Sequence, residues 1–460
     1  MSDTLWTSQE IADATGGMVH RGQIHASGVS IDTRTLTPGD LFVALAGERD
    51  GHEFVTAALK KGAGGVLASR AVEGASVVVP DTFVALQALG RAARDRAPDC
   101  RRAAVTGSVG KTSVTRAIAA GLSLAGPSHA SVKSYNNHIG VPLTLARMPR
   151  ETQRAVFEVG MNHADEITPL SRQVAPHVAV VTTVGPVHVE NFADGEAGVA
   201  RAKAEIFDGM APGGVAVLNA DNHWFDLLAA AAHARGAKVV RFGSDPWCDA
   251  ELRSYAAEAG GGRIEATVLG HKIDFVIPQP GAHWGPNSLA VLLALDALGV
   301  GLDTGVNALK SFAALEGRGA ERRLRLHGGD FTLIDESYNA NPLSMRSALM
   351  SLKGRPGRRI AVLTDMLELG PEAARYHAAL AEDLESAEVQ TVFCAGPLMR
   401  SLWDNLPTAR RGAYAPSAGE LAPEVVRAVE PGDAVMVKGS NGSKAALIVQ
   451  ALVDAAGREG

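Results

Sequence analysis

An apolar segment that runs into a glycine-containing loop and then into a Lys-Thr pair constrains this chain more than any other feature. Residues 103–105 have the composition of a buried strand, and residues 106–110 connect them to Lys111 and Thr112. Glycines in such a loop let backbone N–H groups point at phosphate oxygens, and the N-terminus of the following helix adds partial positive charge. Lys111 would reach the β- and γ-phosphates of a nucleotide, and the Thr112 hydroxyl would bind magnesium. We therefore predict a strand, a phosphate-binding loop and a helix in succession.

The spacing of this loop departs from the common G-x-x-x-x-G-K-T pattern, because the first glycine would fall at Val105. The alternative is a tight strand-to-helix turn with a solvated lysine. Phosphate binding explains the glycines, the lysine and the threonine together, so we favour it. The residues predicted to bind the nucleotide through the loop are Thr106, Gly107, Ser108, Val109, Gly110, Lys111, Thr112 and Ser113.

Short apolar runs alternate with longer helical patterns over most of the chain. Such runs occur at 155–159, 178–183 and 215–218, and the alternation resumes beyond a glycine-rich stretch at 316–320. This pattern predicts parallel sheets covered by helices on both faces, which is the α/β class. We predict three domains, which are a small α/β domain at residues 1–82, a central parallel-sheet domain of the P-loop type at 83–315, and a C-terminal doubly wound, Rossmann-like domain at 316–460.

Length and composition agree with a cytoplasmic enzyme of several domains. At roughly 150 residues per domain, 460 residues allow about three domains. Lys and Arg total 44 against 50 Asp and Glu, and this balance argues against a general nucleic-acid binder. Cys100, Cys248 and Cys394 have neither metal-ligand spacing nor the pattern of a disulfide framework, which indicates a reducing compartment. No apolar run approaches the roughly 20 residues that span a bilayer, so we expect no membrane insertion.

Three further polar residues lie near predicted strands, and they indicate a function only when they are considered together. Glu158 lies in the apolar run at 155–159, and the carboxyl ends of parallel strands line a ligand crevice, so it could hold magnesium. Alternatively, Glu158 is a strand-end carboxylate in water or beside a lysine. His188, in the loop after the next strand, is by itself more often a turn histidine than a ligand. Lys203, on a predicted helix, is by itself usually a solvated charge.

Four segments together resemble one family of ligases. They are T-G-S-V-G-K-T at 106–112, N-N-H-I-G-V-P-L-T-L at 136–145, E-V-G-M-N at 158–162 and A-K-A-E-I-F at 202–207. On these segments, and over nearly its whole length, the chain resembles the Mur ligases of peptidoglycan synthesis. The resemblance implies an ATP-dependent enzyme that joins a carboxylate to an amine with the help of Mg²⁺.

The resemblance also implies roles for the polar residues named above. Catalysis would depend on Lys111, Glu158, His188, Lys203 and Arg318. Magnesium would be bound by Thr112, Glu158, His188 and Lys203, with Lys203 present as a carbamate. CO₂ converts a lysine ammonium into a carboxylate-like metal ligand, whereas a bare ammonium would repel the metal.

Two segments around the predicted linker would contact ATP. G-A-H-W-G-P-N-S-L-A at 281–290 resembles a family segment in which the later asparagine, here Asn287, faces the adenine. The alternative for Asn287 is a helix N-cap. Trp284 stands where the family usually has an asparagine, which leaves the role of that position open. Arg318 matches the interdomain arginine of the family, and its alternative is a linker charge.

A polar stretch at the end of a predicted C-terminal strand, D-E-S-Y-N-A-N-P at 335–342, resembles another family segment. The resemblance implies that Asp335 binds the ribose of ATP, and that Tyr338 and Asn339 flank the nucleotide. The alternative is a strand-to-helix turn with capping side chains. D-M-L-E-L-G at 365–370 and His377 also match the family and would lie near the amine substrate.

The first domain narrows the choice of substrates. S-I-D-T-R at 30–34 resembles the uridine-nucleotide domain shared by the tripeptide-forming members and the members that add D-alanyl-D-alanine. The alternative is a surface turn with an Asp–Arg pair. The stretches at 337–342 and 365–370 favour the D-alanyl-D-alanine-adding members. The predicted substrate-binding residues are Ser30, Asp32, Thr33, Arg34, Asn136 and Asn137.

The resemblance thus predicts a monomeric enzyme that joins UDP-N-acetylmuramoyl-tripeptide to D-alanyl-D-alanine through an acyl phosphate. Within the enzyme class, the tripeptide-forming Mur ligases and the folylpolyglutamate-type ligases remain as alternatives. An alternative from another class is a nucleotide-binding regulatory scaffold without catalysis. The intact set of Lys111, Thr112, Glu158, His188 and Lys203 argues against a scaffold.

Overall fold

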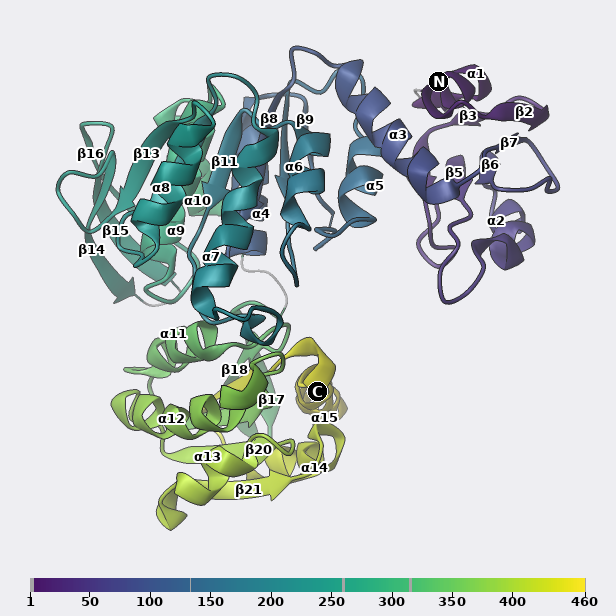
Figure 1. The fold of residues 1–460 in the computed structure, drawn as a ribbon. Coiled ribbons are helices and arrows are strands. Elements are labelled where there is room, and N and C mark those ends of the chain that lie inside the picture. The colour runs from purple at the N-terminus through teal and green to yellow at the C-terminus, as the bar shows by residue number, and fades with distance from the viewer. Residues whose placement is uncertain (1–3, 133, 259–260, 314–316, 460) are drawn as a thin grey trace.

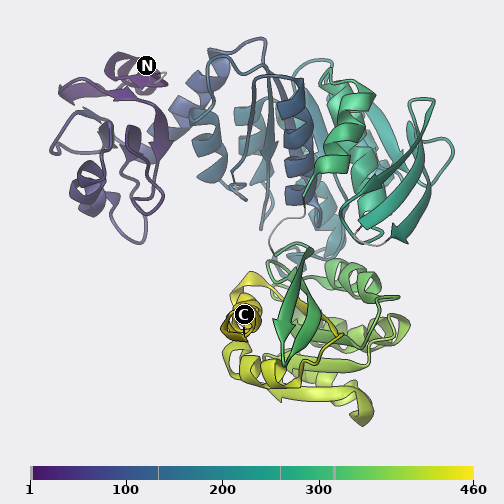
Figure 2. The same cartoon turned by 180° about the vertical axis from the view of Figure 1, so that it is seen from behind.

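The computed structural model describes residues 4–132, 134–258, 261–313 and 317–459. The chain forms three α/β domains, each built on its own main sheet, and this confirms the predicted fold class (Figure 1). The middle domain contacts the other two, with the N-terminal domain at one end and the C-terminal domain below it in this view (Figures 1 and 2). The predicted boundary between residues 315 and 316 lies outside the described residues, and the domain limits stay predictions.

The N-terminal domain consists of short elements around a small sheet. They are β1 (Trp6–Thr7), α1 (Ser8–Thr15), β2 (Met18–Arg21), β3 (His25–Ala26), β4 (Gly28–Ser30), β5 (Asp40–Val43), α2 (Val55–Lys60), β6 (Gly65–Ala68) and β7 (Ser76–Val78). The main sheet has the order β2-β7-β6-β5-β4, and β2 is antiparallel to β7 whereas the other pairs are parallel. Helix α1 begins after a capping box between Thr7 and Glu10 and ends at Gly16 in the left-handed conformation.

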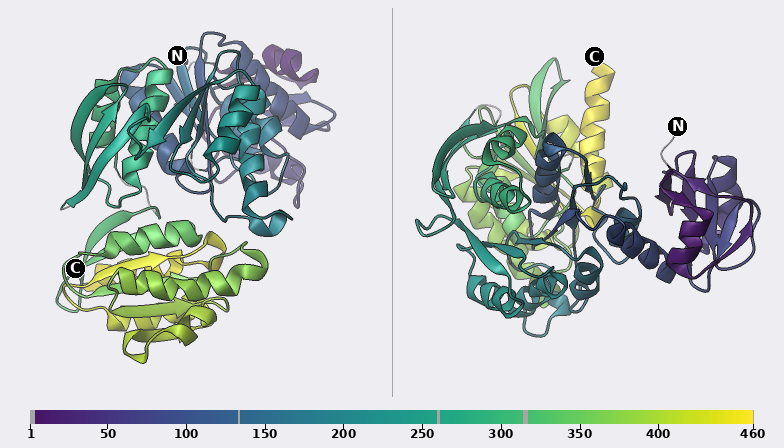
Figure 3. Two further views of the ribbon diagram at one scale, coloured as in Figure 1. Left: turned by 60° about the vertical axis from the view of Figure 1, so that its left-hand side comes forward. Right: turned by 90° about the horizontal axis from the view of Figure 1, so that it is seen from above.

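Helix α3 (Thr82–Asp95) joins the N-terminal domain to the middle domain. It packs against α5 (Gly140–Ala146) of the middle domain. The indole N–H of Trp6 donates to the carbonyl of Ala146 at 2.8 Å and thereby fastens the start of the chain to the same helix. The N-terminal domain therefore lies to the side of the middle domain, away from the C-terminal domain (Figure 3).

The middle domain contains a large mixed sheet. Its strands are β8 (Arg101–Thr106), β9 (Ser128–Ala130), β10 (Arg154–Glu158), β11 (Val178–Val181), β12 (Val215–Asn219), β13 (Lys238–Gly243), β14 (Ala250–Glu258), β15 (Gly261–Val268) and β16 (His271–Ile277). The order is β16-β15-β14-β13-β12-β11-β8-β10-β9, so β8 lies between β11 and β10. All pairs from β9 to β14 are parallel, whereas β14, β15 and β16 form antiparallel pairs.

Helices cover both faces of this sheet. They are α4 (Lys111–Ala125), α6 (Ile167–Val174), α7 (Glu196–Ala204), α8 (Phe225–Ala234), α9 (Trp284–Ala297) and α10 (Leu302–Ser311), besides α5. Ala103 and Val105 of β8 pack into the core with α4, α9 and α10, whereas Ala104 packs into the opposite core with α5, α6, α7 and α8. Because β8 is buried on both faces, its sequence is apolar without alternation.

The C-terminal domain is a second helix-covered sheet. Its elements are β17 (Ala320–Leu326), β18 (Gly329–Glu336), α11 (Pro342–Leu352), β19 (Arg359–Thr364), α12 (Ala373–Ser386), β20 (Thr391–Ala395), α13 (Arg400–Asn405), β21 (Arg411–Ala415), α14 (Ala418–Ala428), β22 (Ala434–Lys438) and α15 (Ala446–Glu459). The order is β17-β18-β22-β19-β20-β21, and only β17 is antiparallel among these described strands. Helices α11, α12 and α13 pack on one face and α14 and α15 on the other (Figure 1).

The predicted strands at 155–159, 178–183 and 215–218 are confirmed as β10, β11 and β12. The antiparallel strands β14 to β16 are not among the predicted elements, because they lack the continuous apolar runs of the buried parallel strands and carry exposed polar residues. No helix within the four described ranges is long and apolar enough to cross a membrane.

Candidate active site

A cavity of about 500 Å³ lies between the middle and C-terminal domains. Small-molecule sites typically have volumes of about 300–1,000 Å³. None of the described residues that line it belongs to the N-terminal domain. The predicted site residues that line it are Ser108, Val109, Gly110, Lys111, Thr112, Ser113, Asn136, Glu158, His188, Asn287, Arg318, Tyr338 and Asn339. The predicted site residues outside its lining are Ser30, Asp32, Thr33, Arg34, Thr106, Gly107, Asn137, Lys203 and Asp335.

The phosphate loop follows β8 and leads into α4, as predicted. Gly107 and Gly110 have φ angles of 150° and 84°, which favour glycine. A Cβ on Gly107 would overlap the hydroxyl of Thr182, so a second constraint also excludes a side chain there. The same hydroxyl donates to the carbonyl of Val109 at 2.5 Å and holds the loop against the end of β11. The loop is thus a shaped turn at the N-terminus of α4, as anion binding requires.

Lys111 is the first residue of α4, and its side chain turns back over the loop. Its ammonium donates to the carbonyl of Gly107 at 2.6 Å. Burial lowers the pKa of Lys111, the positive charge of Arg318 lowers it further, and Glu158 raises it. Two cationic side chains, Lys111 and Arg318, therefore face the same cavity from two domains.

Glu158 ends β10 and is 1% exposed. One carboxylate oxygen accepts a hydrogen bond from the Thr112 hydroxyl at 2.7 Å, and the other accepts from the amide of Asn136 at 2.7 Å. The Thr112 hydroxyl also lies 3.2 Å from that of Ser134. The alternative of a carboxylate in open water is therefore wrong, and Glu158 belongs to a hydrogen-bonded group at the cavity.

His188 has a left-handed backbone conformation, with φ of 58°, and lines the cavity. Its Nδ1 lies 2.5 Å from a carboxylate oxygen of Glu368, which belongs to the C-terminal domain. This contact holds the pKa of Glu368 below its usual value. His188 of the middle domain therefore contacts the C-terminal domain and does not lie in a free surface turn.

Lys203 lies on α7 and is 2% exposed, so it is not a solvated helix charge. Burial, and secondarily the charge of Lys111, lowers the pKa of Lys203 well below its usual value. A lysine with a lowered pKa is deprotonated more readily, and the neutral amine is the form that reacts with CO₂.

The donor set at the cavity fits magnesium. Within the described ranges, no three or more His, Cys, Asp and Glu side chains form a metal-binding group. Mg²⁺, however, is usually bound through one or two carboxylates together with substrate phosphates. Glu158 and Thr112 present such oxygens beside the phosphate loop.

Asn287 is the fourth residue of α9, and His283 is the N-cap residue of that helix. The N-cap alternative for Asn287 is therefore wrong. Its side chain lies beside the phosphate loop, because a Cβ on Gly110 would lie 3.2 Å from the Asn287 amide oxygen. Trp284 is 4% exposed and packs against Phe312 in the core, so it does not reach the cavity.

Arg318 connects the two domains that enclose the cavity. Its guanidinium lies over the ring of Tyr338, 4.1 Å from the ring centroid, and donates to the hydroxyl of Ser134 in the middle domain at 3.3 Å. These contacts exclude a free linker charge. The side chains of Arg318 and Tyr338 form one wall of the cavity.

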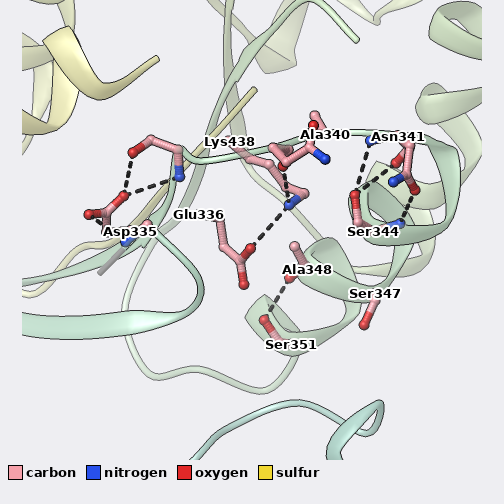
Figure 4. Close-up of polar contacts among 12 residues, drawn as sticks. Asp335, Glu336, Ala340, Asn341, Ser344, Ser347, Ala348, Ser351 and Lys438 are labelled. Carbon is pink, nitrogen blue, oxygen red and sulfur yellow. Dashed lines mark hydrogen bonds and ion pairs between the residues drawn. The ribbon is translucent and has the colours of Figure 1, made fainter. Parts of the chain in front are cut away.

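Asp335 does not line the cavity, although the family resemblance implies that it binds the ribose. Its carboxylate accepts hydrogen bonds from the N–H groups of Gly317 (3.2 Å) and Ser337 (3.1 Å) and from the Ser337 hydroxyl (2.6 Å). Glu336 lines the cavity instead, and its carboxylate pairs with Lys438 at 3.1 Å (Figure 4). Successive residues of a strand point to opposite sides, so only one of the two acidic neighbours faces the cavity.

Comparison with known proteins identifies the family. Residues 25–113 match the Mur ligase family catalytic domain, residues 105–295 the Mur ligase middle domain, and residues 322–441 the Mur ligase glutamate ligase domain. The UDP-N-acetylmuramoyl-tripeptide--D-alanyl-D-alanine ligase of Rickettsia prowazekii (strain Madrid E) is 30% identical over 97% of this chain and 99% of its own. The chain belongs to the Mur ligase family.

Two further proteins show how far the likeness of this Mur ligase extends. The enzyme of Escherichia coli (strain K12) with the same name as the Rickettsia relative is 36% identical over 85% of this chain and 86% of its own. The crystal structure of MurF from Acinetobacter baumannii matches with a TM-score of 0.86 and 28% identity, and covers 98% of this chain and 99% of its own. The likeness therefore includes all three domains.

The N-terminal residues of this Mur ligase form a turn apart from the cavity. Arg34 is paired with Asp32 at 2.7 Å, and its side chain is 87% exposed. The hydrogen bond from Arg34 holds the pKa of Asp32 below its usual value. The hydroxyl of buried Ser30 donates to the carbonyl of Asp32 at 3.1 Å, and Lys61 donates to the carbonyl of Thr33 at 2.8 Å. Residues 30–34 thus form a turn with an Asp–Arg pair, as in the alternative of a plain surface turn. The Arg34 guanidinium remains accessible.

Asn136 and Asn137 are separated by the fold. Asn136 reaches Glu158, whereas the side chain of Asn137 accepts from the N–H of Gly140 at 2.9 Å at the start of α5. His377 is buried, and its Nε2 accepts from the N–H of Met366 at 3.0 Å. Neither Asn137 nor His377 lines the cavity.

Glu336, Lys438, His283 and Ser347 also line the cavity and are not among the predicted site residues. His283 and Ser347 connect the domains, because Nδ1 of His283 lies 2.9 Å from the Ser347 hydroxyl. Lys438 ends β22, so its place at the carboxyl end of a parallel strand is the signal that could have identified it.

Proposed function

We infer that this Mur ligase joins D-alanyl-D-alanine to UDP-N-acetylmuramoyl-tripeptide in an ATP-dependent step of peptidoglycan synthesis. The likeness to the Rickettsia and Escherichia coli enzymes of that name, over most of each chain, carries this conclusion. The phosphate loop that faces Arg318 and Glu336 across one cavity supports it, because a ligase must enclose ATP between domains that close on each other.

The reaction that we propose has two steps. The terminal carboxylate of the tripeptide attacks the γ-phosphorus of ATP, ADP leaves, and an acyl phosphate forms. The amine of D-alanyl-D-alanine then attacks the acyl carbon, the amine loses a proton, and phosphate leaves as the amide forms. Enclosure of the acyl phosphate would protect it from hydrolysis. The protein contributes mainly orientation and charge neutralisation.

Lys111 and Arg318 would neutralise the phosphate charge from opposite domains, since both line the cavity. Thr112, Glu158 and His188, with Lys203 as a carbamate, are the residues that would hold Mg²⁺. The metal would withdraw charge from the phosphate oxygens and lower their repulsion of the attacking carboxylate. The lowered pKa of Lys203 supports the carbamate, because it increases the neutral fraction of the amine.

The nucleoside would lie between the second and third domains. Asn287 beside Gly110 supports an adenine contact, and the Arg318–Tyr338 wall supports a stacking surface. We propose Glu336 rather than Asp335 as the carboxylate near the ribose, because Glu336 lines the cavity. Asn339 would complete this side of the site.

The UDP part of the acid substrate would bind at Ser30, Asp32, Thr33 and Arg34, and Asn136 would contact the part nearest the phosphate loop. The exposed guanidinium of Arg34 supports a role in binding a pyrophosphate. Residues 1–82, 83–315 and 316–460 are proposed as the three functional domains. A monomeric, cytoplasmic enzyme that does not bind nucleic acid remains our prediction.

Phosphate release by the purified chain tests the assignment. With ATP, Mg²⁺ and UDP-N-acetylmuramoyl-tripeptide present, we expect release to require D-alanyl-D-alanine. Release that depends on meso-diaminopimelate or glutamate, with the corresponding acid substrate, would reassign the chain to the tripeptide-forming or folylpolyglutamate-type ligases. Nucleotide binding without release under any of these conditions would support a scaffold.

A further inference from the structure

Lys438 is a buried lysine that the proposed reaction does not use. It ends β22 at the centre of the C-terminal sheet and is 2% exposed. Its ammonium donates to the carboxylate of Glu336 at 3.1 Å and to the carbonyl of Asn339 at 3.0 Å (Figure 4). A buried ammonium is costly to desolvate unless it is paired, so these two contacts account for its stability at this position.

Both partners of Lys438 belong to one short segment, residues 336–341, which connects β18 to α11. Ser440, two residues beyond Lys438, donates to the carbonyl of Ala340 at 3.2 Å. The last residue of β22 and Ser440, just after this strand, therefore hold two consecutive carbonyls of the segment. At the far end of the segment, Asn341 forms the capping box of α11 with Ser344.

The segment held in this way carries side chains of the cavity wall. Tyr338 lines the cavity between the two residues that Lys438 binds, and its ring packs against Arg318. Tyr338 is 40% exposed, so its place also depends on backbone contacts of the segment. The Tyr338 N–H donates to the carbonyl of Gly317 at 3.1 Å, and Lys438 and Ser440 bind the carbonyls of Asn339 and Ala340.

We propose that Lys438 is a positioning residue for the nucleotide, which sets the place of Glu336, Tyr338 and Asn339 through their segment. This inference rests on the proposed function, because it requires that ATP binds against these residues. Loss of the ammonium would free the Asn339 carbonyl and leave the Glu336 carboxylate without its partner. ATP would then bind more weakly, whereas sites for the other substrates would be less affected.

Calorimetric titration with ATP, together with KM measurements, tests this role on the full chain. For Lys438→Met we expect about tenfold weaker ATP binding and a similar rise in KM for ATP, with KM for D-alanyl-D-alanine changed less than about twofold. Lys272→Met is the matched control, because Lys272 is an exposed lysine of β16. A general loss of structure would instead lower the active fraction, and with it the apparent kcat, without a selective rise in KM for ATP.

A double variant tests the charge pairing by stability alone. Lys438→Met with Glu336→Gln leaves no unpaired buried charge, so its Tm should recover relative to Lys438→Met; ATP binding is compared between Lys438→Met and wild type only, because Glu336 would itself face the ribose. If Lys438→Met does not fold, Lys438→Gln serves in the same assay. Its shorter side chain keeps a polar group for folding but loses the ammonium that pairs with Glu336 and reaches the Asn339 carbonyl, so we expect it to bind ATP more weakly.

Two outcomes would overturn the proposal in distinguishable ways. ATP binding of wild-type strength by the folded Lys438 variants would overturn the positioning role alone. Failure of the wild-type chain to bind ATP would overturn the proposed function and this inference with it.

Discussion

Two loops of the cavity wall, one from each domain, are held in different ways. The phosphate loop at 106–113 is shaped partly by its own backbone, since Gly110 is left-handed and Lys111 donates to the carbonyl of Gly107, and the Thr182 hydroxyl fastens it to the end of β11. The segment at 336–341 is held by residues far away in the chain, because Lys438 and Ser440 bind carbonyls 99 and 100 residues away. The lysine of the first loop thus bonds locally, whereas the carbonyls of the second segment are bound only in the assembled sheet.

The two loops should therefore respond differently to substitution. The Lys111 ammonium bonds within its own loop, so its loss should impair the reaction with little loss of fold. The second segment is positioned by tertiary contacts, so substitutions there should alter nucleotide affinity and stability. Five substitutions, each with its own measurement, test that division.

Lys111→Ala should have the largest effect. It removes the ammonium that would neutralise the γ-phosphate, and loss of one such group in phosphoryl transfer lowers kcat on the order of 10³-fold. Because the hydrogen bond of Lys111 is to its own loop, Tm should change little. Phosphate release at saturating ATP measures kcat, and thermal melting measures Tm. A kcat within about tenfold of wild type would contradict the role of the loop.

Lys203→Ala should reduce kcat by about 100-fold, as expected when one ligand near a metal is lost. Added formate or acetate should restore part of the activity, because a short carboxylate can occupy the place of the carbamate. An independent measurement is the ¹³C NMR signal of a carbamate in wild-type protein supplied with ¹³C-bicarbonate. Absence of that signal, together with no rescue, would remove Lys203 from the metal site.

Glu336→Gln and Asp335→Asn should differ, although the residues are neighbours. Glu336→Gln should weaken ATP binding by about three- to tenfold, since Glu336 lines the cavity and would face the ribose. Titration with ATP measures the affinity. An effect on ATP binding that is larger for Asp335→Asn would return the ribose contact to Asp335.

Asp335→Asn should act mainly on stability. The wild-type carboxylate accepts hydrogen bonds from two backbone N–H groups and from the Ser337 hydroxyl. In the variant, the NH₂ group of the asparagine would face one of these donors, and the lost hydrogen bond should cost about 1–3 kcal/mol of unfolding free energy. Urea denaturation measures this free energy. An unchanged midpoint would show that the contacts of Asp335 with residues 317 and 337 do not stabilise the domain.

Arg34→Ala should have the smallest effect on the fold, because an exposed Asp–Arg pair contributes little. KM for the UDP-linked tripeptide should nevertheless rise about tenfold, as for one lost charge-assisted hydrogen bond. KM for ATP, measured in the same assay, is the internal control. Equal values for wild type and variant would favour the alternative of a plain surface turn.

Much of the fold follows from short stretches of sequence. The buried strands β8, β10 and β11 are apolar on both faces, so their parallel arrangement is predictable. The antiparallel strands β14 to β16 lack such apolar runs, and their place at the sheet edge depends on the pairing of β14 with β13. Trp284 shows the same limit, because a residue in a binding motif turned out to pack against Phe312 in the core.

The α/β class and the phosphate loop could be predicted from the sequence alone, because glycines, an apolar strand and a Lys-Thr pair act within a few residues of one another, and longer motifs gave the resemblance to the family. Tertiary contacts were needed to show that Glu336 rather than Asp335 faces the cavity and that Lys438 is a buried residue of its lining. Those outcomes depend on which side of β18 meets β22 and the middle domain, and such pairings between distant segments leave no local pattern in the chain.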